Sequence, residues 1–350
     1  MTLSLKKISV FLFSIILSNN VFSAESFKMC WSIYAGWMPW AYASESGIID
    51  KWAKKYDIEI DVVQINDYIE PINQYTSGEF DACTMTNMDA LTIPAAGGVD
   101  STMLIVGDYS NGNDAIILKG KDKLEDIKGQ QVNLVELSVS HYFLARALES
   151  VGMSEKDVKV INTSDADMTS IFGTKSVTSV VTWNPMASDI LKMPKANSVY
   201  DSSAIPGEII DGLVANTAVL KKHPELGKAL VGAWYETLEK MQGDSKEAKA
   251  IRSKMAEAAA TDLAGYDAQL AQTFLFYSPA DAVKFVKDKQ LLTTSTYVSE
   301  FSFKHGLLGE GAPDASFIGV EMPAGVYGNP KNIKLRFNKS FAEMAAEGKL

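Results

Sequence analysis

The stretch FKMCWSI at residues 27–33, followed by YAGWMPWAY at residues 34–42, indicates how this chain folds. The first part is an apolar run of strand length, and the second crowds four large aromatic side chains, a glycine and a proline into nine positions. A helix-like stretch follows at residues 43–56, so the aromatic residues mark a strand-to-helix turn, where open α/β sheets bind ligands. Because large rings are costly to leave in water, we expect them to cover a pocket; the alternative is ordinary core beneath the rim of a lobe.

Short apolar strands alternate with amphipathic helical stretches over the first part of the chain. The predicted strands are residues 58–63, 82–85, 102–106, 115–118, 131–134, 158–161 and 177–182. Helical stretches lie between them, for example at residues 70–76, 141–151 and 166–172. This alternation predicts parallel α/β layers. From Thr217 onward the pattern is mainly helical, at residues 220–241, 246–261 and 279–288.

Two turn-rich breaks, at residues 107–113 and 201–207, separate apolar strands. We interpret them as two adjacent crossings between lobes, which form a hinge that closes around a ligand. The predicted lobe boundaries are residues 25–110 and 204–328 for the first lobe, 111–203 for the second, and 329–350 for a loosely held tail.

Residues 1–24 have the composition of a secretory signal peptide. Lys6 and Lys7 precede an apolar run at residues 8–17, and small residues at 21–24 suit a cleavage site. The run is too short to anchor the chain in a bilayer. We therefore expect the mature protein to be periplasmic.

The chain carries a formal net charge of −10, which argues against nucleic acid or anionic lipid as a partner. Cys30 and Cys83 are the only cysteines, and both lie in strand-like runs. They form either a disulfide or two separate buried thiols, and the sequence leaves both possibilities open. Their separation does not suggest a metal site.

Several motifs carry a resemblance to a known family. YTSGEFD at residues 75–81 and KLEDIKG at 123–129 each precede an apolar strand, SVSH at 138–141 opens a helix, and VVTWNP at 180–185 ends a strand. Their order resembles the periplasmic substrate-binding proteins of ABC transporters, in the nitrate, taurine, alkanesulfonate and thiamine-precursor group. The resemblance covers residues 27–241 and implies a two-lobe α/β periplasmic-binding-protein fold of type II, hinged, with a mainly helical C-terminal region.

Within that group the chain most resembles the binding proteins encoded beside urea carboxylase, an enzyme type associated with guanidine. The segments that carry this are WSIYAGWMPW at residues 31–40, TMTNMD at 84–89 and VNLVELSVSH at 132–141. The resemblance implies a monomer that captures a small nitrogen-rich compound, such as guanidine or urea, for an ABC permease and its ATPase at the inner membrane. The alternatives are a binder of taurine, nitrate or sulfonate anions, and a role in sensing instead of transport.

The distribution of charged residues along the chain indicates the charge of the ligand, independently of the family resemblance. No lysine or arginine occurs between Lys55 and Lys119, whereas that span holds eleven acidic residues. An anion site would need basic side chains or helix N-termini, and carboxylates turned into a closed cleft need a cation or strong donors. A guanidinium matches a carboxylate with its N–H groups and stacks on indole with its face. We therefore expect a cation or a neutral, donor-rich molecule.

The candidate ligand-binding residues lie near the ends of predicted strands, on the first crossing or at a helix start: Trp37, Asn87, Asp89, Asp108, Glu136, Ser140, His141 and Trp183. Asp89 either contacts the ligand or caps a helix, and Asp108 either contacts it or makes a turn. Either Ser138 or Ser140 caps the helix that follows Glu136, which leaves the glutamate to face the cleft. Asp165 and Asp167 are interpreted as helix caps, and Trp31 as core.

A periplasmic enzyme on the same fold is a further alternative, since the related thiamine-precursor enzymes use histidines. Ser140 and His141 are neighbours at a helix start and point different ways, and no Gly-x-Ser-x-Gly motif occurs. No His-Glu-x-x-His motif or acidic calcium loop is present either. We therefore expect no catalytic residue, no metal and no cofactor.

Overall fold

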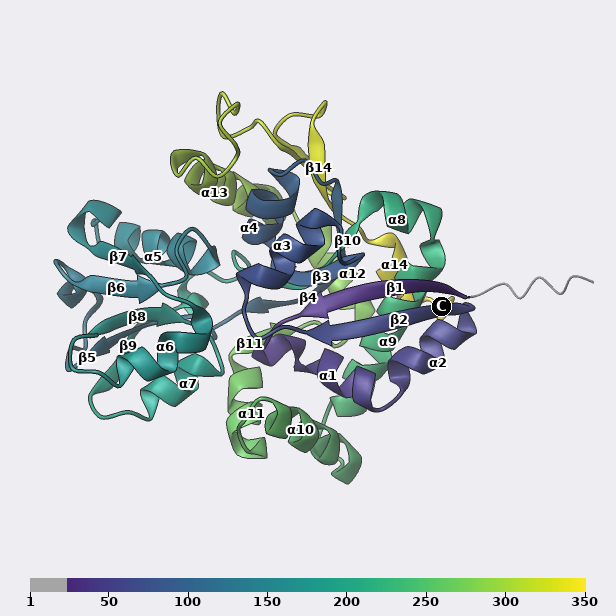
Figure 1. Ribbon diagram of the computed structural model, residues 1–350, viewed down its shortest axis with the longest axis horizontal. Helices are drawn as coiled ribbons and strands as arrows, with labels where there is room; N and C mark the ends of the chain where they lie inside the picture. The colour runs from purple at the N-terminus through teal and green to yellow at the C-terminus, as the bar shows by residue number, and fades with distance from the viewer. Residues whose placement is uncertain (1–23) are drawn as a thin grey trace, which may run out of the picture.

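The computed structural model describes residues 24–350, so nearly all of the predicted signal peptide lies outside the described residues. Two separate sheets organise these residues into a larger and a smaller lobe (Figure 1). Within residues 24–350, no helix is long and apolar enough to cross a membrane.

The larger lobe is built on a nine-stranded sheet. Its strands, in spatial order, are β13 (Gly325–Tyr327), β12 (Gly319–Met322), β14 (Ile333–Phe337), β4 (Ser101–Ser110), β10 (Ile210–Asn216), β3 (Ala82–Thr86), β1 (Glu25–Trp31) and β2 (Ile58–Gln64), with β11 (Thr273–Leu275) paired to β4. The helices of this lobe are α1 (Met38–Glu45), α2 (Ile48–Lys55), α3 (Ile69–Ser77), α4 (Asn87–Ala90), α8 (Thr217–Lys222), α9 (Pro224–Met241), α10 (Lys246–Ala258), α11 (Leu263–Ala271), α12 (Pro279–Val286), α13 (Gln290–Lys304) and α14 (Ser340–Ala346).

The smaller lobe is built on a five-stranded sheet. Its strands, in spatial order, are β7 (Lys159–Asn162), β6 (Gln131–Leu134), β8 (Ser179–Thr182), β5 (Ala115–Lys119) and β9 (Ala196–Asp201). Its helices are α5 (Val139–Ser150), α6 (Asp165–Phe172) and α7 (Met186–Leu191). This is the α/β two-lobe architecture that the sequence predicts.

The opening stretch forms the expected strand-to-helix turn. β1 pairs in parallel with both β2 and β3, which buries it in the sheet interior, and a short 3-10 helix, η1 (Ala35–Trp37), connects it to α1. Pro39 lies in the first turn of α1, where its missing N–H has no helical partner to lose. Cys30 and Cys83 are opposite one another on β1 and β3 and form a disulfide, which settles the question that the sequence leaves open.

The two crossings between the lobes lie side by side. Ser110 and Ser202 share a hydrogen bond of 2.6 Å between their hydroxyl oxygens, and the N–H of Ser202 donates to the carbonyl of Asp114 at 3.0 Å. The first crossing begins later than the predicted break at residues 107–113, because β4 continues to Ser110. There the short strand β11 pairs with it and supplies partners for its backbone.

The C-terminal residues differ from the expected loose tail. β14 pairs in parallel with β4, so residues 333–337 form an interior strand of the larger sheet. α14 packs on α9, where the ring of Phe341 lies over Gly227. A β-carbon at Gly227 would lie 2.6 Å from that ring, so this close approach requires glycine. The apolar positions of β14 therefore belong to the core of the larger lobe.

Candidate functional site

A small cavity lies where the two lobes meet. Its volume is about 20 Å³, measured as the space open to the centre of a water-sized sphere. The residues that line it are Tyr34, Trp37, Tyr68, Thr86, Asp114, Val139, Trp183, Ile209 and Asp211. The larger lobe supplies η1, the start of α3, the end of β3 and the start of β10, while the smaller lobe supplies the start of α5 and the end of β8. The cavity is therefore formed by strand ends and helix starts of both lobes.

Four aromatic rings form the apolar part of the cavity. The ring of Trp37 lies edge-on to that of Tyr34, with centroids 5.0 Å apart, and stacks at 6.1 Å on Tyr68. Tyr68 in turn makes an edge contact at 5.4 Å with Trp183 from the smaller lobe. All four side chains are buried. Of the aromatic run that follows β1, Tyr34 and Trp37 line the cavity, whereas Trp40 packs on Trp234 in the core, so the predicted pocket involves only part of that run.

Two of these tyrosines hold buried aspartates. The hydroxyl of Tyr34 donates to Oδ1 of Asp108 at 2.7 Å, and the hydroxyl of Tyr68 donates to Oδ2 of Asp89 at 2.5 Å. Thr86 donates to the same oxygen of Asp89 at 2.8 Å, and the backbone N–H of Val139, at the start of α5, lies close enough to Asp89 to lower its pKa. Asp89 therefore connects the larger lobe to the first turn of a helix in the smaller lobe.

Asp211 and Asp114 bring two more carboxylates to the cavity lining. Asp211 on β10 is opposite Asp108 on β4 in the antiparallel register. Asp114 accepts a hydrogen bond of 2.6 Å from Ser110 on the first crossing. Gly36 makes this crowding possible, because a β-carbon there would lie 2.5 Å from Oδ2 of Asp108.

Several carboxylate oxygens of this site lack hydrogen-bond donors. Oδ1 of Asp89 and Oδ2 of both Asp108 and Asp211 are buried without a hydrogen-bond donor, and the indole N–H of Trp37 is buried without an acceptor. Burial raises the pKa of Asp89 and of Asp114 to about 6. Burial also raises the pKa of Asp108 to about 8, and burial together with the charge of Asp108 raises that of Asp211 well above its ordinary value.

No basic side chain offsets these charges among the described residues that line the cavity. Buried carboxylates without donors or counter-ions carry a large desolvation cost, which a bound cation would relieve. The cavity thus combines aromatic faces with unsatisfied acceptors, an arrangement suited to a small cation rich in N–H groups.

Of the candidate ligand-binding residues predicted from the sequence, some lie at the cavity and others do not. Trp37 and Trp183 line the cavity, and Asp89 and Asp108 lie directly behind its tyrosines. Asn87 is buried, but its side chain accepts from the N–H of Ile210 and donates to the carbonyl of Glu208, so it ties α4 to the second crossing.

Three further candidates, all near the start of α5, do not line the cavity. Ser140 is fully buried, and its hydroxyl has no hydrogen-bond partner. Glu136 is exposed, and its backbone N–H donates to Asn162 of the same lobe. His141 faces a separate cluster at the lobe interface.

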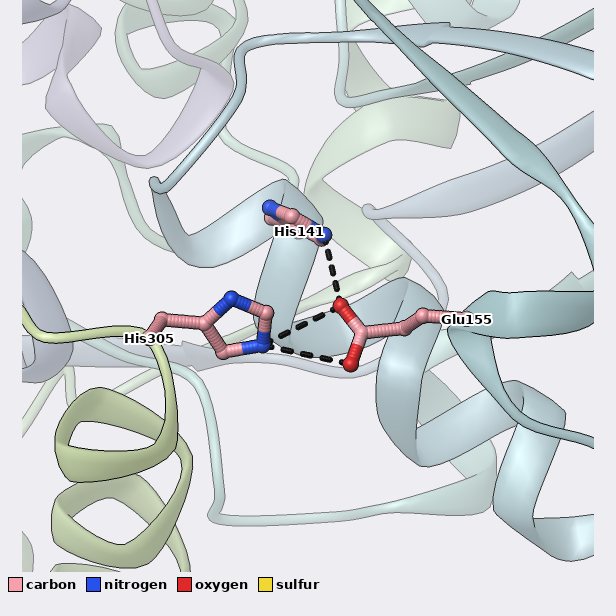
Figure 2. A group of neighbouring side chains, drawn as sticks. All are labelled: His141, Glu155 and His305. Atoms are coloured by element: carbon pink, nitrogen blue, oxygen red, sulfur yellow. Dashed lines mark hydrogen bonds and ion pairs between the residues drawn. The ribbon is translucent and has the colours of Figure 1, made fainter.

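That cluster is formed by His141, Glu155 and His305 (Figure 2). Nε2 of His141 lies 2.8 Å from Glu155, and Nε2 of His305, which follows α13 of the larger lobe, lies 3.1 Å from it. Lys304 joins the same carboxylate at 2.8 Å. Although burial alone would raise it, hydrogen bonds from His141 and Lys304 hold the pKa of Glu155 at about 2.

Two clusters of described residues have the composition of a metal site: His141, Glu155 and His305, and a surface cluster of Glu25, His223 and Glu225. In the first, Nδ1 of His141 accepts the N–H of Leu137 at 3.2 Å, and Nε2 lies 2.8 Å from Glu155. With Lys304 and His305 on the same carboxylate, these contacts join the two lobes.

Sequence reasoning did not select several residues that line the cavity. Tyr34 lies in the quoted aromatic run, and Tyr68 follows β2, but neither was singled out. Asp114 is one of the eleven acids between Lys55 and Lys119. Asp211 is an acid within the buried apolar run that forms β10, and such an interruption of a strand is a signal that could have found it. The remaining lining residues, Thr86, Val139 and Ile209, carry no sequence signal of a site.

The fold and the site together define a two-lobe α/β protein with a cavity between its lobes. The chain belongs to the NMT1/THI5-like family, whose model matches residues 52–248. No curated protein sequence matches the chain.

Solved structures with the same fold include the alkanesulfonate-binding protein SsuA of Xanthomonas axonopodis pv. citri, bound to MOPS. It is 15% identical, with a TM-score of 0.66 over 82% of this chain and 96% of that one. The periplasmic nitrate-binding protein NrtA of Synechocystis PCC 6803 is 12% identical, with a TM-score of 0.65 over 93% of this chain and 89% of that one. A putative periplasmic sulfonate-binding protein of Methylobacillus flagellatus KT is 14% identical, with a TM-score of 0.67 over 93% and 95%.

Proposed function

We propose that this protein is the periplasmic solute-binding component of an ABC importer and that it captures a small nitrogen-rich compound of the guanidine or urea type, preferring the cation. The observation that carries the proposal is the composition of the interlobe cavity, where aromatic rings and buried carboxylates meet with no lysine or arginine among the described lining residues. A guanidinium ion supplies both a face for the rings and donors for the carboxylates.

The size of the cavity supports a ligand of few atoms. A cavity can hold one water molecule when the volume open to the centre of a water-sized sphere is about 10–15 Å³. That volume is about 20 Å³ here. This volume favours a small planar ligand over a longer alkanesulfonate.

The electrostatics of the site argue against an anion. Sulfonate and nitrate are the ligand classes named for the solved structures of this fold. An anion would be favoured at a helix N-terminus, where free N–H groups point outward. Here the carboxylate of Asp89 lies beside the first N–H of α5, so a protein acid is already near that position and would repel a second negative charge.

Contacts between the lobes support capture by closure. The hydroxyl of Ser164 in the smaller lobe donates to Asp67 at 3.3 Å, and Asn184 donates to Gln272 at 2.8 Å. The indole N–H of Trp183 reaches the carbonyl of Ile33 at 3.5 Å. These contacts hold a conformation that encloses the cavity, and hinge opening at the two crossings would admit the ligand.

Calorimetric titration with guanidinium, methylguanidinium, urea, taurine and nitrate tests the proposal. All ligands are used at concentrations far below those that denature proteins. We expect guanidinium to bind most tightly, urea more weakly, and the two anions not at all. Asp122→Asn removes an exposed acid of the smaller lobe, and it serves as the control for the variants described below that remove one negative charge from the site. Binding of taurine or nitrate without binding of guanidinium or urea would overturn the proposal.

A further inference from the structure

Asp108 and Asp211 form a buried acid pair next to the cavity. They are opposite one another on β4 and β10, and their exposed fractions are 0% and 3%. Oδ2 of each carboxyl group is buried with no hydrogen-bond partner. Two buried carboxylates that face each other without a counter-charge do not both stay ionised, because like charges and burial each favour the protonated form. The geometry therefore favours one proton held by the pair of Asp108 and Asp211.

The surroundings of the pair offer no other counter-charge. Among the described residues, the titratable groups that interact with the pair are Tyr34, Tyr266, Asp89 and Asp114, and none of them is basic. Tyr34 donates its single hydroxyl proton to Asp108, and the nearby hydroxyl of Tyr266 donates to the carbonyl of Ala35. Apart from the hydrogen bond from Tyr34, the shared proton is what reduces the repulsion between the two carboxylates.

We propose that a cationic ligand enters this site in exchange for the proton that Asp108 and Asp211 share, so that binding of the cation releases one proton to solvent. This inference rests on the proposed function. In the exchange, the O–H bond of the pair breaks, both carboxylates become charged, and the ligand N–H groups take over as donors. No electrons are transferred. The ligand remains a cation, because a guanidinium group does not lose its proton near neutral pH.

The exchange makes the affinity for a cation depend on pH in a defined way. Over the pH range in which the ligand-free pair holds its proton, each rise of one pH unit should tighten binding about tenfold, because one proton is exchanged for one cation. Once the pair has lost that proton in the absence of ligand, the affinity should become constant. A neutral ligand such as urea leaves the proton in place and should bind with little dependence on pH.

Calorimetry in buffers of different ionisation enthalpy measures the released proton directly. At pH 7 the observed enthalpy of guanidinium binding is compared in phosphate and in Tris, and the difference gives the number of protons released. We expect a value close to one for guanidinium and close to zero for urea. Guanidinium binding with no proton released and no change in affinity between pH 6 and pH 7 would overturn the exchange and leave the proposed function intact. No binding of guanidinium in any buffer would overturn both.

Asp211→Asn gives a second measurement. Its amide can donate to Asp108 and keep that carboxylate charged, so proton release should fall to near zero even where some guanidinium binding remains. Asp122→Asn should release the same proton as the unmodified protein. Circular dichroism checks that the Asn variant is folded. If it does not fold, the pH dependence of the unmodified protein still decides the question. Full proton release by folded Asp211→Asn would remove Asp211 from the exchange.

Discussion

The backbone N–H of Tyr68 in the larger lobe donates a hydrogen bond of 3.3 Å to Oδ1 of Asp165 in the smaller lobe. Tyr68 also lines the cavity with its ring, so one residue joins the ligand site to the contact between the lobes. The sequence assigns Asp165 to a helix cap. In the structure Ser164 is the N-cap residue of α6, and Asp165 lies in the first turn with its carboxylate directed across the interface.

Asp165→Ala should therefore weaken ligand binding without touching the ligand. Loss of one hydrogen bond of about 0.5–1.5 kcal/mol from the closed form corresponds to a loss of affinity of roughly two- to tenfold, seen as faster dissociation. Asp167→Ala is the matched control, because Asp167 lies in the same first turn but is exposed. Stopped-flow dissociation of guanidinium from the two variants makes the comparison, and equal rates would show that Asp165 acts only through the helix.

Trp183 should contribute through its aromatic face as well as its bulk. We expect Trp183→Leu to lose roughly five- to thirtyfold in guanidinium affinity, since a desolvated cation–π contact contributes about 1–2 kcal/mol. Trp183→Phe keeps a ring at the same position and should recover part of the loss. Titration calorimetry at one pH measures the guanidinium affinity of both variants. Equal losses of affinity in Trp183→Leu and Trp183→Phe would argue that Trp183 contributes through packing alone.

Glu136→Gln distinguishes two placements of this side chain. The sequence predicts that Glu136 faces the ligand, whereas the structure places it outside the cavity lining. If Glu136 faced the ligand, the change would cost about 1.5–3 kcal/mol with a cation. Because the residue is exposed and does not line the cavity, we expect guanidinium affinity to stay within about twofold. A larger loss, in a variant with an unchanged circular dichroism spectrum, would return Glu136 to the site.

The sequence predicted the fold well because its signals are local. Alternation of strands and helices, the turn after β1 and the two crossings follow from nearby residues. The tail was misjudged because β14 pairs with β4, which is more than 200 residues away in the chain, and such pairing has no local signature.

The candidate site was predicted only in part for the same reason. Trp37 and the excess of acids were visible, whereas the pairing of Asp211 with Asp108 depends on the register of two distant strands. Glu136 and His141 are near Val139, which does line the cavity, but the direction in which the first turn of α5 points is set by tertiary packing.

The stability of the ligand-free protein should fall as pH rises from about 5 to 8. The pKa is raised by burial for Asp89, Asp114 and Asp165 to about 6 and for Asp108 to about 8, and that of Asp211 is raised well above its ordinary value. In this range the folded protein binds more protons than the unfolded chain, so folding loses stability as protons become scarce. His305, whose pKa burial lowers, acts in the opposite direction but is a single group against five. Glu155, with a pKa of about 2, contributes stability that is lost only below about pH 4.5, outside this window.

Thermal unfolding at pH 5 and pH 8 measures this effect. Without ligand, we expect the midpoint to be several degrees higher at pH 5. Saturating guanidinium should raise the midpoint more at pH 8 than at pH 5, because the cation replaces the missing protons. Asp211→Asn removes one of the raised groups and should reduce the difference between the two pH values, whereas the exposed control Asp122→Asn should not. A midpoint that rises from pH 5 to pH 8 in the unmodified protein would show that the buried carboxylates are already compensated by groups outside the cavity.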